Sequence, residues 1–202
     1  DMQRALKNSL QVGFAATVLS TTFAVLAALG LVRMRRFGRA VAWSLIGAPL
    51  IIAEIVLAVG TLGFFIAVGI PLGKPGLIIA HTAFCIPFAL LPIRARLGQL
   101  EAAPFEAAAD LGASEGQILR RITLPLLAPA ILSGALLAFA ISIDDFITSF
   151  FVAGPGSTTL PVYIFGMIRS TVTPEVDAIS SLLLLFSGIV LVSSYVLNRR
   201  RR

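Results

Sequence analysis

The chain has 202 residues, of which 57% are hydrophobic and 13% are charged, and its mean hydropathy is +0.96. A soluble globular domain is roughly one quarter charged, so this composition excludes an ordinary soluble fold and indicates a membrane protein. The net charge of +6 would favour a nucleic-acid partner in a soluble domain. Here the basic residues gather at the ends of apolar runs, and we expect no binding to nucleic acid.

Five apolar runs predict membrane-spanning helices, since about 20 apolar residues cross the hydrocarbon core as a helix and open strands would leave backbone groups unsatisfied. The predicted spans are residues 11–32, 43–66, 76–93, 122–143 and 178–197. No linker or convincing internal repeat divides them. Residues 1–202 are therefore predicted to form one all-α transmembrane domain, a polytopic helix bundle.

The second run is the least regular, because residues 40–70 contain Pro49 and Glu54. A single helix over this run would be about 46 Å long, which exceeds the thickness of the hydrocarbon core, whereas two spans would each be too short. We place one span at 43–66 and expect the remainder to form a turn or a short half-helix on the outer face.

The arginines and lysines predict the orientation of the bundle. The successive loops are 1–10, 33–39, 71–75, 94–121, 144–177 and 199–202, with Lys and Arg counts of 2, 4, 1, 4, 1 and 4. By the positive-inside rule, the second and fourth loops and the C-terminal tail are cytoplasmic and the N-terminus is outside. Because this outside start has no initiating Met, we expect an upstream helix in the intact subunit, which would then have six spans.

The loop 94–121 interrupts the apolar pattern with a charged, alanine-rich segment that predicts two short water-exposed helices. Pro104 suits the first turn of one helix, and Gly112 suits a left-handed end. Ser114 and Gln117 then have the spacing of a capping box at the start of the second helix. The low alanine face would let a partner's groove approach closely. The alternative is an exposed amphipathic loop without a partner.

The spacing within EAAADLGASEGQILRRITLP, residues 106–125, resembles the EAA loop motif of permease subunits of binding-protein-dependent ABC importers. The matching residues are Glu106, Ala107, Ala108, Gly112, Ile122, Leu124 and Pro125. The resemblance implies that a cleft in a cytoplasmic ATPase receives this loop. These residues, together with Asp110, would then couple the ATPase to the membrane helices.

Further segments look like the spermidine/putrescine importer permease subunits: DMQRALKNSL, APLIIAEIVLAVG, and the stretch from SIDDFITSFF to EVDAIS. The resemblance implies the type I ABC importer permease fold in a bacterial inner membrane. It also implies a second permease subunit, and an extracytoplasmic solute-binding protein that docks near the GPG at 154–156. The arginine-rich tail is expected to anchor the topology, with membrane lipid as a further contact.

Three acidic residues are candidates for a cation pathway. Glu54 is the only ionisable residue deep in a predicted span, where a charge costs about 2.5–3.5 kcal/mol on insertion scales. It would either line the pathway or pair with a partner in helix packing. Asp144 and Asp145 follow the fourth span, and adjacent residues on a helix point about 100° apart, so one would face the pathway while the other caps or pairs.

Aromatic residues follow these carboxylates, and their faces attract ammonium groups. The candidates for the substrate pathway are Phe146, Phe150 and Tyr163. The alternative is that these rings are anchors at the membrane interface.

Enzymatic and metal chemistry find no support in the sequence. His81 and Cys85 supply only two ligands on one helix face, which does not make a metal site, so packing is the better interpretation. No GxxxxGK[ST] loop is present, and we expect ATP and Mg to bind a partner ATPase. The remaining alternatives are an importer permease for another small solute, and an autonomous channel or ion-coupled secondary transporter, for which only Pro49 and Glu54 are suggestive.

Overall fold

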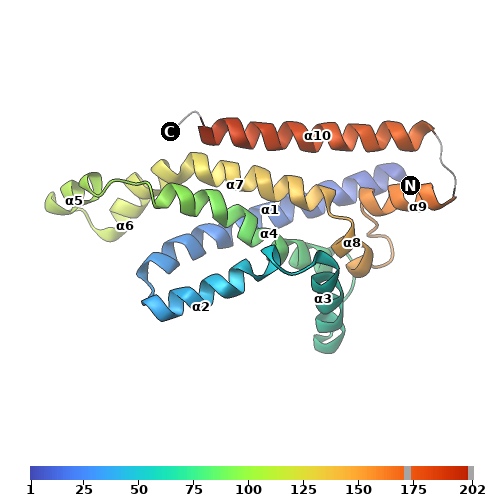
Figure 1. The fold of residues 1–202 in the computed structure, drawn as a ribbon, viewed down its shortest axis with the longest axis horizontal. Coiled ribbons are helices and arrows are strands. Elements are labelled where there is room, and N and C mark those ends of the chain that lie inside the picture. Colours follow the sequence, from blue (N-terminus) through green and yellow to red (C-terminus); the bar gives the residue numbers. More distant parts are fainter. Residues whose placement is uncertain (171–173, 200–202) are drawn as a thin grey trace.

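The computed structural model describes residues 1–170 and 174–199, and it confirms the predicted all-α class (Figure 1). The elements in chain order are α1 (Met2–Arg33), α2 (Arg36–Gly47), the 3-10 turn η1 (Ala48–Leu50), α3 (Glu54–Val68), α4 (Lys74–Leu97), α5 (Ala103–Asp110), α6 (Glu115–Ile118), the π-helical turn η2 (Leu119–Thr123), α7 (Leu124–Asp144), α8 (Ile147–Val152), α9 (Leu160–Ser170) and α10 (Pro174–Arg199).

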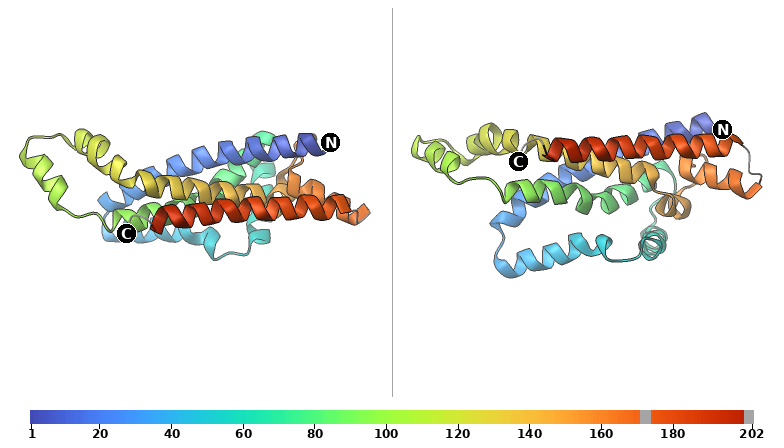
Figure 2. Two further views of the ribbon diagram at one scale, coloured as in Figure 1. Left: turned by 90° about the horizontal axis from the view of Figure 1, so that it is seen from above. Right: turned by 45° about the horizontal axis from the view of Figure 1, so that its top comes forward.

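The centre of the molecule is a bundle of α1, α4 and α7, with α10 packed along α7 (Figure 2). Small residues allow the helices to approach closely, as is common in membranes. A Cβ placed on Gly134 of α7 would lie 2.5 Å from the carbonyl oxygen of Ala89 in α4, so only glycine permits this crossing. One buried cluster joins the three helices, and it includes Ala24 of α1, Cys85 of α4 and Ala138 of α7.

Among the described residues, three helical segments are long and apolar enough to cross a membrane: α1, α4 and the run Glu115–Asp144. A fourth crossing exists only if the pair formed by α2–η1 and α3 counts as one span. The fifth predicted span falls in α10, whose described apolar part, Ser181–Ser194, is shorter than a complete crossing. That span therefore stays a prediction, and residues 200–202 of the arginine tail lie outside the described residues.

The region predicted as one span, residues 43–66, does not form a continuous helix in the structure. The chain leaves α2 through the 3-10 turn that contains Pro49, and α3 begins at Glu54 after a bend of 107°. Proline has no amide hydrogen to continue the helical ladder, which favours the break at this point. In Figure 1, α3 lies across the direction of the bundle. Glu54 is consequently in the first turn of a helix, where the dipole favours a carboxylate, and not in the middle of one.

The two arginine-rich loops lie at the same end of the bundle, as their charge predicts. The connection from α1 to α2 and the segment with α5 and α6 share one end, and the N-terminus, α8 and α9 lie at the other (Figure 1). The relative placement of these loops is therefore confirmed. Which end faces the cytoplasm stays a prediction.

Candidate functional site: an exposed helical loop and an acidic cluster at opposite ends

The loop between α4 and α7 projects beyond the bundle as two short helices, α5 and α6, neither of which contains a buried residue. Pro104 occupies the first turn of α5, as predicted. Gly112 follows the end of α5 with a φ of 79°, in the left-handed region that glycine adopts without strain. The amide of Gly112 donates a hydrogen bond to the carbonyl oxygen of Ala109 at 2.9 Å, and the amide of Ala113 donates one to the carbonyl oxygen of Ala108 at 3.0 Å. These two bonds form a Schellman cap.

The second helix starts with the capping box that its sequence predicts. The backbone amide of Ser114 donates to Gln117 Oε1 at 2.8 Å, and the amide of Gln117 donates to Ser114 Oγ at 3.4 Å. One ion pair, between Arg33 of α1 and Glu115 of α6 at 2.6 Å, connects this loop to the bundle. Both side chains are at least 75% exposed, so the pair adds little stability.

The residues of the EAA pattern occupy two places in this loop. Glu106, Ala107 and Asp110 are exposed on α5, and Ala108 is half-buried. Ile122 lies in the π-helical turn, and Leu124 with Pro125 begins α7. The pattern thus spans both the exposed helix and its attachment to a transmembrane helix.

Leu111, which sequence reasoning did not select, is 89% exposed beside Gly112. It lines a shallow hollow together with Ala108, Ala113 and Ile118. A large apolar side chain in this position gives a partner a place to bury apolar area. Its signal in the sequence is a leucine directly before the glycine of a charged, alanine-rich loop.

The three acidic candidates lie at the opposite end of the bundle, where α3 packs against α8. Glu54 at the start of α3 lies close enough to Asp145 and Asp144 for their charges to interact. Asp144 is exposed, whereas Asp145 is 5% exposed. The two adjacent aspartates therefore differ in their access to solvent, and which of them faces a pathway stays a prediction. Asp145 Oδ1 accepts a hydrogen bond from the backbone amide of Ser149 at 3.2 Å, in the first turn of α8.

A buried polar network reaches Asp145 through Ser149. Nδ1 of His81 lies 2.8 Å from Ser142 Oγ, and Nε2 lies 3.1 Å from Ser149 Oγ. His81 is 1% exposed, so it bridges α4, α7 and α8 inside the protein, in agreement with the predicted packing role. Within the described residues no three metal-binding side chains gather. The second carboxylate oxygen of Asp145, Oδ2, is buried and makes no hydrogen bond to the described residues.

Two of the three aromatic candidates belong to one cluster beside these carboxylates. The ring centroids of Phe146 and Phe150 are 5.5 Å apart, and Phe165 of α9 lies 4.7 Å from Phe146. Sequence reasoning missed Phe165, because only the fold of α9 brings it to this position. The guanidinium of Arg169 lies 5.8 Å from the Phe165 ring. Within the described part of the chain, Tyr163 makes no contact with another aromatic ring. It lies two residues before Phe165 in α9, so its side chain points about 200° away from that of Phe165 around the helix.

The fold defines the class of protein. The structure resembles that of the MetNI methionine ABC transporter in inward-facing conformations with a TM-score of 0.79 over 98% of this chain and 95% of the other, at 17% identity. It resembles a chain of a bacterial alginate ABC transporter with a TM-score of 0.74 over 98% and 78% of the two chains, at 18% identity. These likenesses establish the type I ABC importer permease fold.

The sequence comparison gives the family. Residues 20–202 match the binding-protein-dependent transport system inner membrane component, and the chain belongs to this family of multi-pass membrane proteins. It is 39% identical over 197 residues to the spermidine/putrescine transport system permease protein PotC of Haemophilus influenzae, covering 98% of this chain and 77% of the relative. It is 36% identical over 209 residues to the putrescine transport system permease protein PotI of Escherichia coli K12, covering 100% and 74%. The resemblance inferred from the EAA pattern is confirmed.

Proposed function

We propose that this chain is the permease subunit of an ATP-driven importer and forms part of the translocation path for a polyamine such as spermidine or putrescine. The observation that carries the proposal is that Glu54, Asp144 and Asp145 lie at one end of the bundle, where α3 packs against α8 and an aromatic cluster forms. The relatives named above, which are called spermidine and putrescine permeases, support the same cargo. A second permease subunit completes the path.

The chemistry of the acidic cluster suits a cargo with several ammonium groups. Burying a carboxylate without a partner for its second oxygen is costly, and an ammonium group at Asp145 Oδ2 would offset that cost. The exposed Asp144 offers an earlier contact on the way in, since it can attract a cation from solution. The faces of Phe146 and Phe150 add favourable cation–π contacts. Arg169 over Phe165 shows the same kind of contact with a resident cation.

The exposed loop is the site at which ATP energy reaches the membrane. Helix α5 and Leu111 would seat in a cleft of a separate cytoplasmic ATPase subunit, which binds ATP and Mg. Because Ile122, Leu124 and Pro125 join the loop to α7, a movement of α5 would be transmitted to the helix that ends at Asp144. An extracytoplasmic binding protein would deliver cargo at that far end, and the C-terminus would lie in the cytoplasm.

The bend between α2 and α3 favours one alternative, because broken helices also mark ion-coupled secondary transporters. The other alternative is a permease of the same class for a different small solute. Uptake that continues without an ATPase would support the secondary transporter, and competition by unlabelled solutes would identify another cargo.

The direct test of the cargo site is uptake of labelled spermidine into proteoliposomes that contain the complete importer and its binding protein. A hydrogen bond to a charged group contributes about 1.5–3 kcal/mol, so Asp145→Asn should lower the efficiency of uptake by roughly 10–150-fold. Asp144→Asn should act mainly by raising the concentration needed for half-maximal uptake. ATP hydrolysis without cargo should be unchanged in both.

The matched control is Asp1→Asn, because Asp1 is exposed at the same end of the bundle and outside the cluster. It removes the same charge and should leave uptake unchanged. Normal spermidine uptake by Asp144→Asn and Asp145→Asn would exclude both carboxylates from the path.

A further inference from the structure

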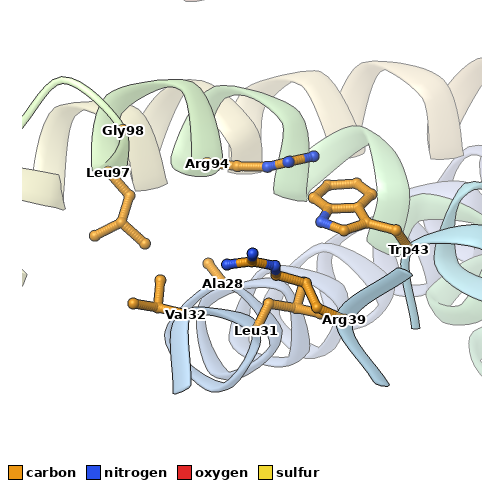
Figure 3. Close-up of a pocket in the computed structure, with 8 residues that line it drawn as sticks. All are labelled: Ala28, Leu31, Val32, Arg39, Trp43, Arg94, Leu97 and Gly98. Atoms are coloured by element: carbon orange, nitrogen blue, oxygen red, sulfur yellow. The ribbon is translucent and has the colours of Figure 1, made fainter. Parts of the chain in front are cut away.

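The end of the bundle that is predicted to be cytoplasmic contains a pocket of about 340 Å³ between α1, α2 and α4 (Figure 3). Its floor is apolar and is formed by Ala28 and Leu31 of α1 with Leu97 of α4. Ala28 and Leu31 also belong to the buried cluster of the bundle. The pocket therefore opens beside the interior of the membrane domain and not on a separate soluble surface.

Two arginines approach this pocket from different helices. Arg94, in the last turns of α4, lies with its guanidinium carbon 3.7 Å from the centroid of the Trp43 ring of α2. Arg39, also on α2, lies across the pocket from Arg94, below it in Figure 3. Within the described residues the only ion pair joins Arg33 to Glu115. Neither pocket arginine forms an ion pair with a carboxylate of this described part of the chain, and both arginines are exposed.

We propose that this pocket binds the phosphate group of an anionic phospholipid from the cytoplasmic leaflet, with part of an acyl chain against the apolar floor. Guanidinium groups match phosphate oxygens in paired hydrogen bonds, and basic pockets between transmembrane helices on this side of a membrane bind anionic head groups. Tryptophan favours the depth of the head groups, and Trp43 is half-buried at the rim. A free phosphate shares the charge but would leave the apolar floor uncovered.

The position of the pocket gives the bound lipid a mechanical role. Arg94 lies near the point at which α4 ends and the loop with α5 begins, and Arg39 lies in the helix before the bend at Pro49. A phosphate held by both arginines would connect α2 with the base of that loop. The lipid would thus brace the segment that anchors α5 to the bundle.

The single tryptophan of the chain allows the proposal to be tested by fluorescence. The full chain is reconstituted in phosphatidylcholine bilayers, and brominated phosphatidylglycerol, which quenches nearby tryptophan, is added at increasing mole fraction. We expect Trp43 to be quenched in a saturable way at a low mole fraction. Brominated phosphatidylcholine should quench it only in proportion to its abundance.

Variants separate the pocket from general attraction to a charged surface. A hydrogen bond from a guanidinium to a charged phosphate is worth roughly 10–150-fold in affinity, so Arg39→Gln should weaken binding by about that factor, and Arg39→Gln with Arg94→Gln should weaken it further. Arg39→Gln is the key variant, because the cation over the Trp43 ring is Arg94 and not Arg39, so this change leaves the surroundings of the fluorophore in place. The control is Arg35→Gln with Arg36→Gln, which removes two charges at the start of α2, outside the pocket, and should preserve the preference for phosphatidylglycerol.

Native mass spectrometry of the detergent-purified chain gives a second readout, in which retained phosphatidylglycerol should be lost from Arg39→Gln but not from the control pair. Equal quenching by the two lipids, or equal loss of binding in the control pair, would overturn the proposal. Relief of quenching by inorganic phosphate at matched ionic strength would show a site for free anions and would overturn the assignment to lipid.

Discussion

Replacing Gly112 by alanine should lower the affinity between the proposed ATPase and this permease by about 5–30-fold. The φ of Gly112 is 79°, and a Cβ added there would meet no atom within 4 Å. Packing therefore contributes nothing to the effect, and the whole cost comes from the backbone. Holding an L-residue in the left-handed region costs about 1–2 kcal/mol of conformational free energy. If the ATPase binds only the capped form of the loop, this cost weakens binding by the factor stated above.

A graded series makes the reasoning sharper. Asparagine enters the left-handed region more readily than alanine, so Gly112→Asn should lose less affinity than Gly112→Ala. Gly116→Ala is the matched control, since a Cβ at Gly116 also meets nothing within 4 Å and its φ is not positive. In α6 alanine is a better helix former than glycine, and binding should be preserved or slightly improved.

The assay is the binding of purified ATPase to the permease in lipid nanodiscs, followed by cargo imported per ATP hydrolysed in proteoliposomes. Both should fall in the order wild type, Gly112→Asn, Gly112→Ala. Full affinity and full coupling in Gly112→Ala would refute the role of the capped loop. Equal losses in Gly112→Ala and Gly116→Ala would show that any change of flexibility in this loop is harmful, and that the left-handed turn is not special.

Two further predictions concern the stability of the bundle. Gly134→Ala places a methyl group 2.5 Å from a backbone oxygen of α4, so it should lower the free energy of unfolding by about 1–3 kcal/mol. Thermal unfolding in detergent measures this loss. The control is Gly60→Ala in α3, where a Cβ meets nothing within 4 Å, and this variant should not be destabilised. A drop in the melting temperature of Gly60→Ala as large as that of Gly134→Ala would contradict this comparison. Arg33→Gln removes the exposed ion pair with Glu115 and should change the free energy of unfolding by less than about 1 kcal/mol. A drop of more than a few degrees in the melting temperature of Arg33→Gln would contradict that expectation.

Local rules of sequence predict the exposed loop well. Pro104, Gly112 and the pair Ser114–Gln117 act through the backbone of their own turns, so their conformations follow from nearest neighbours. The bend before Glu54 was harder to foresee. Pro49 is compatible with a kinked span as well as with a broken one, and length alone favoured a single crossing.

The acidic cluster shows the limit of sequence reasoning more clearly. The sequence selects Glu54 through the cost of a charge inside a span, and it selects Asp145 separately, from its position after the fourth predicted span. Their meeting depends on how α3 and α8 pack, which no local pattern contains. The bonds of His81 to two serines and the arrival of Phe165 beside Phe146 depend on the same tertiary packing. The partners in the cluster were therefore found only in the structure.

The most direct test of the central claim is spermidine uptake by proteoliposomes that contain this permease, its partner permease, the ATPase and the binding protein. We predict uptake against a gradient that requires ATP on the side of α5 and stops when the ATPase is omitted. Concentrative uptake that continues without the ATPase, driven by an ion gradient, would contradict the account.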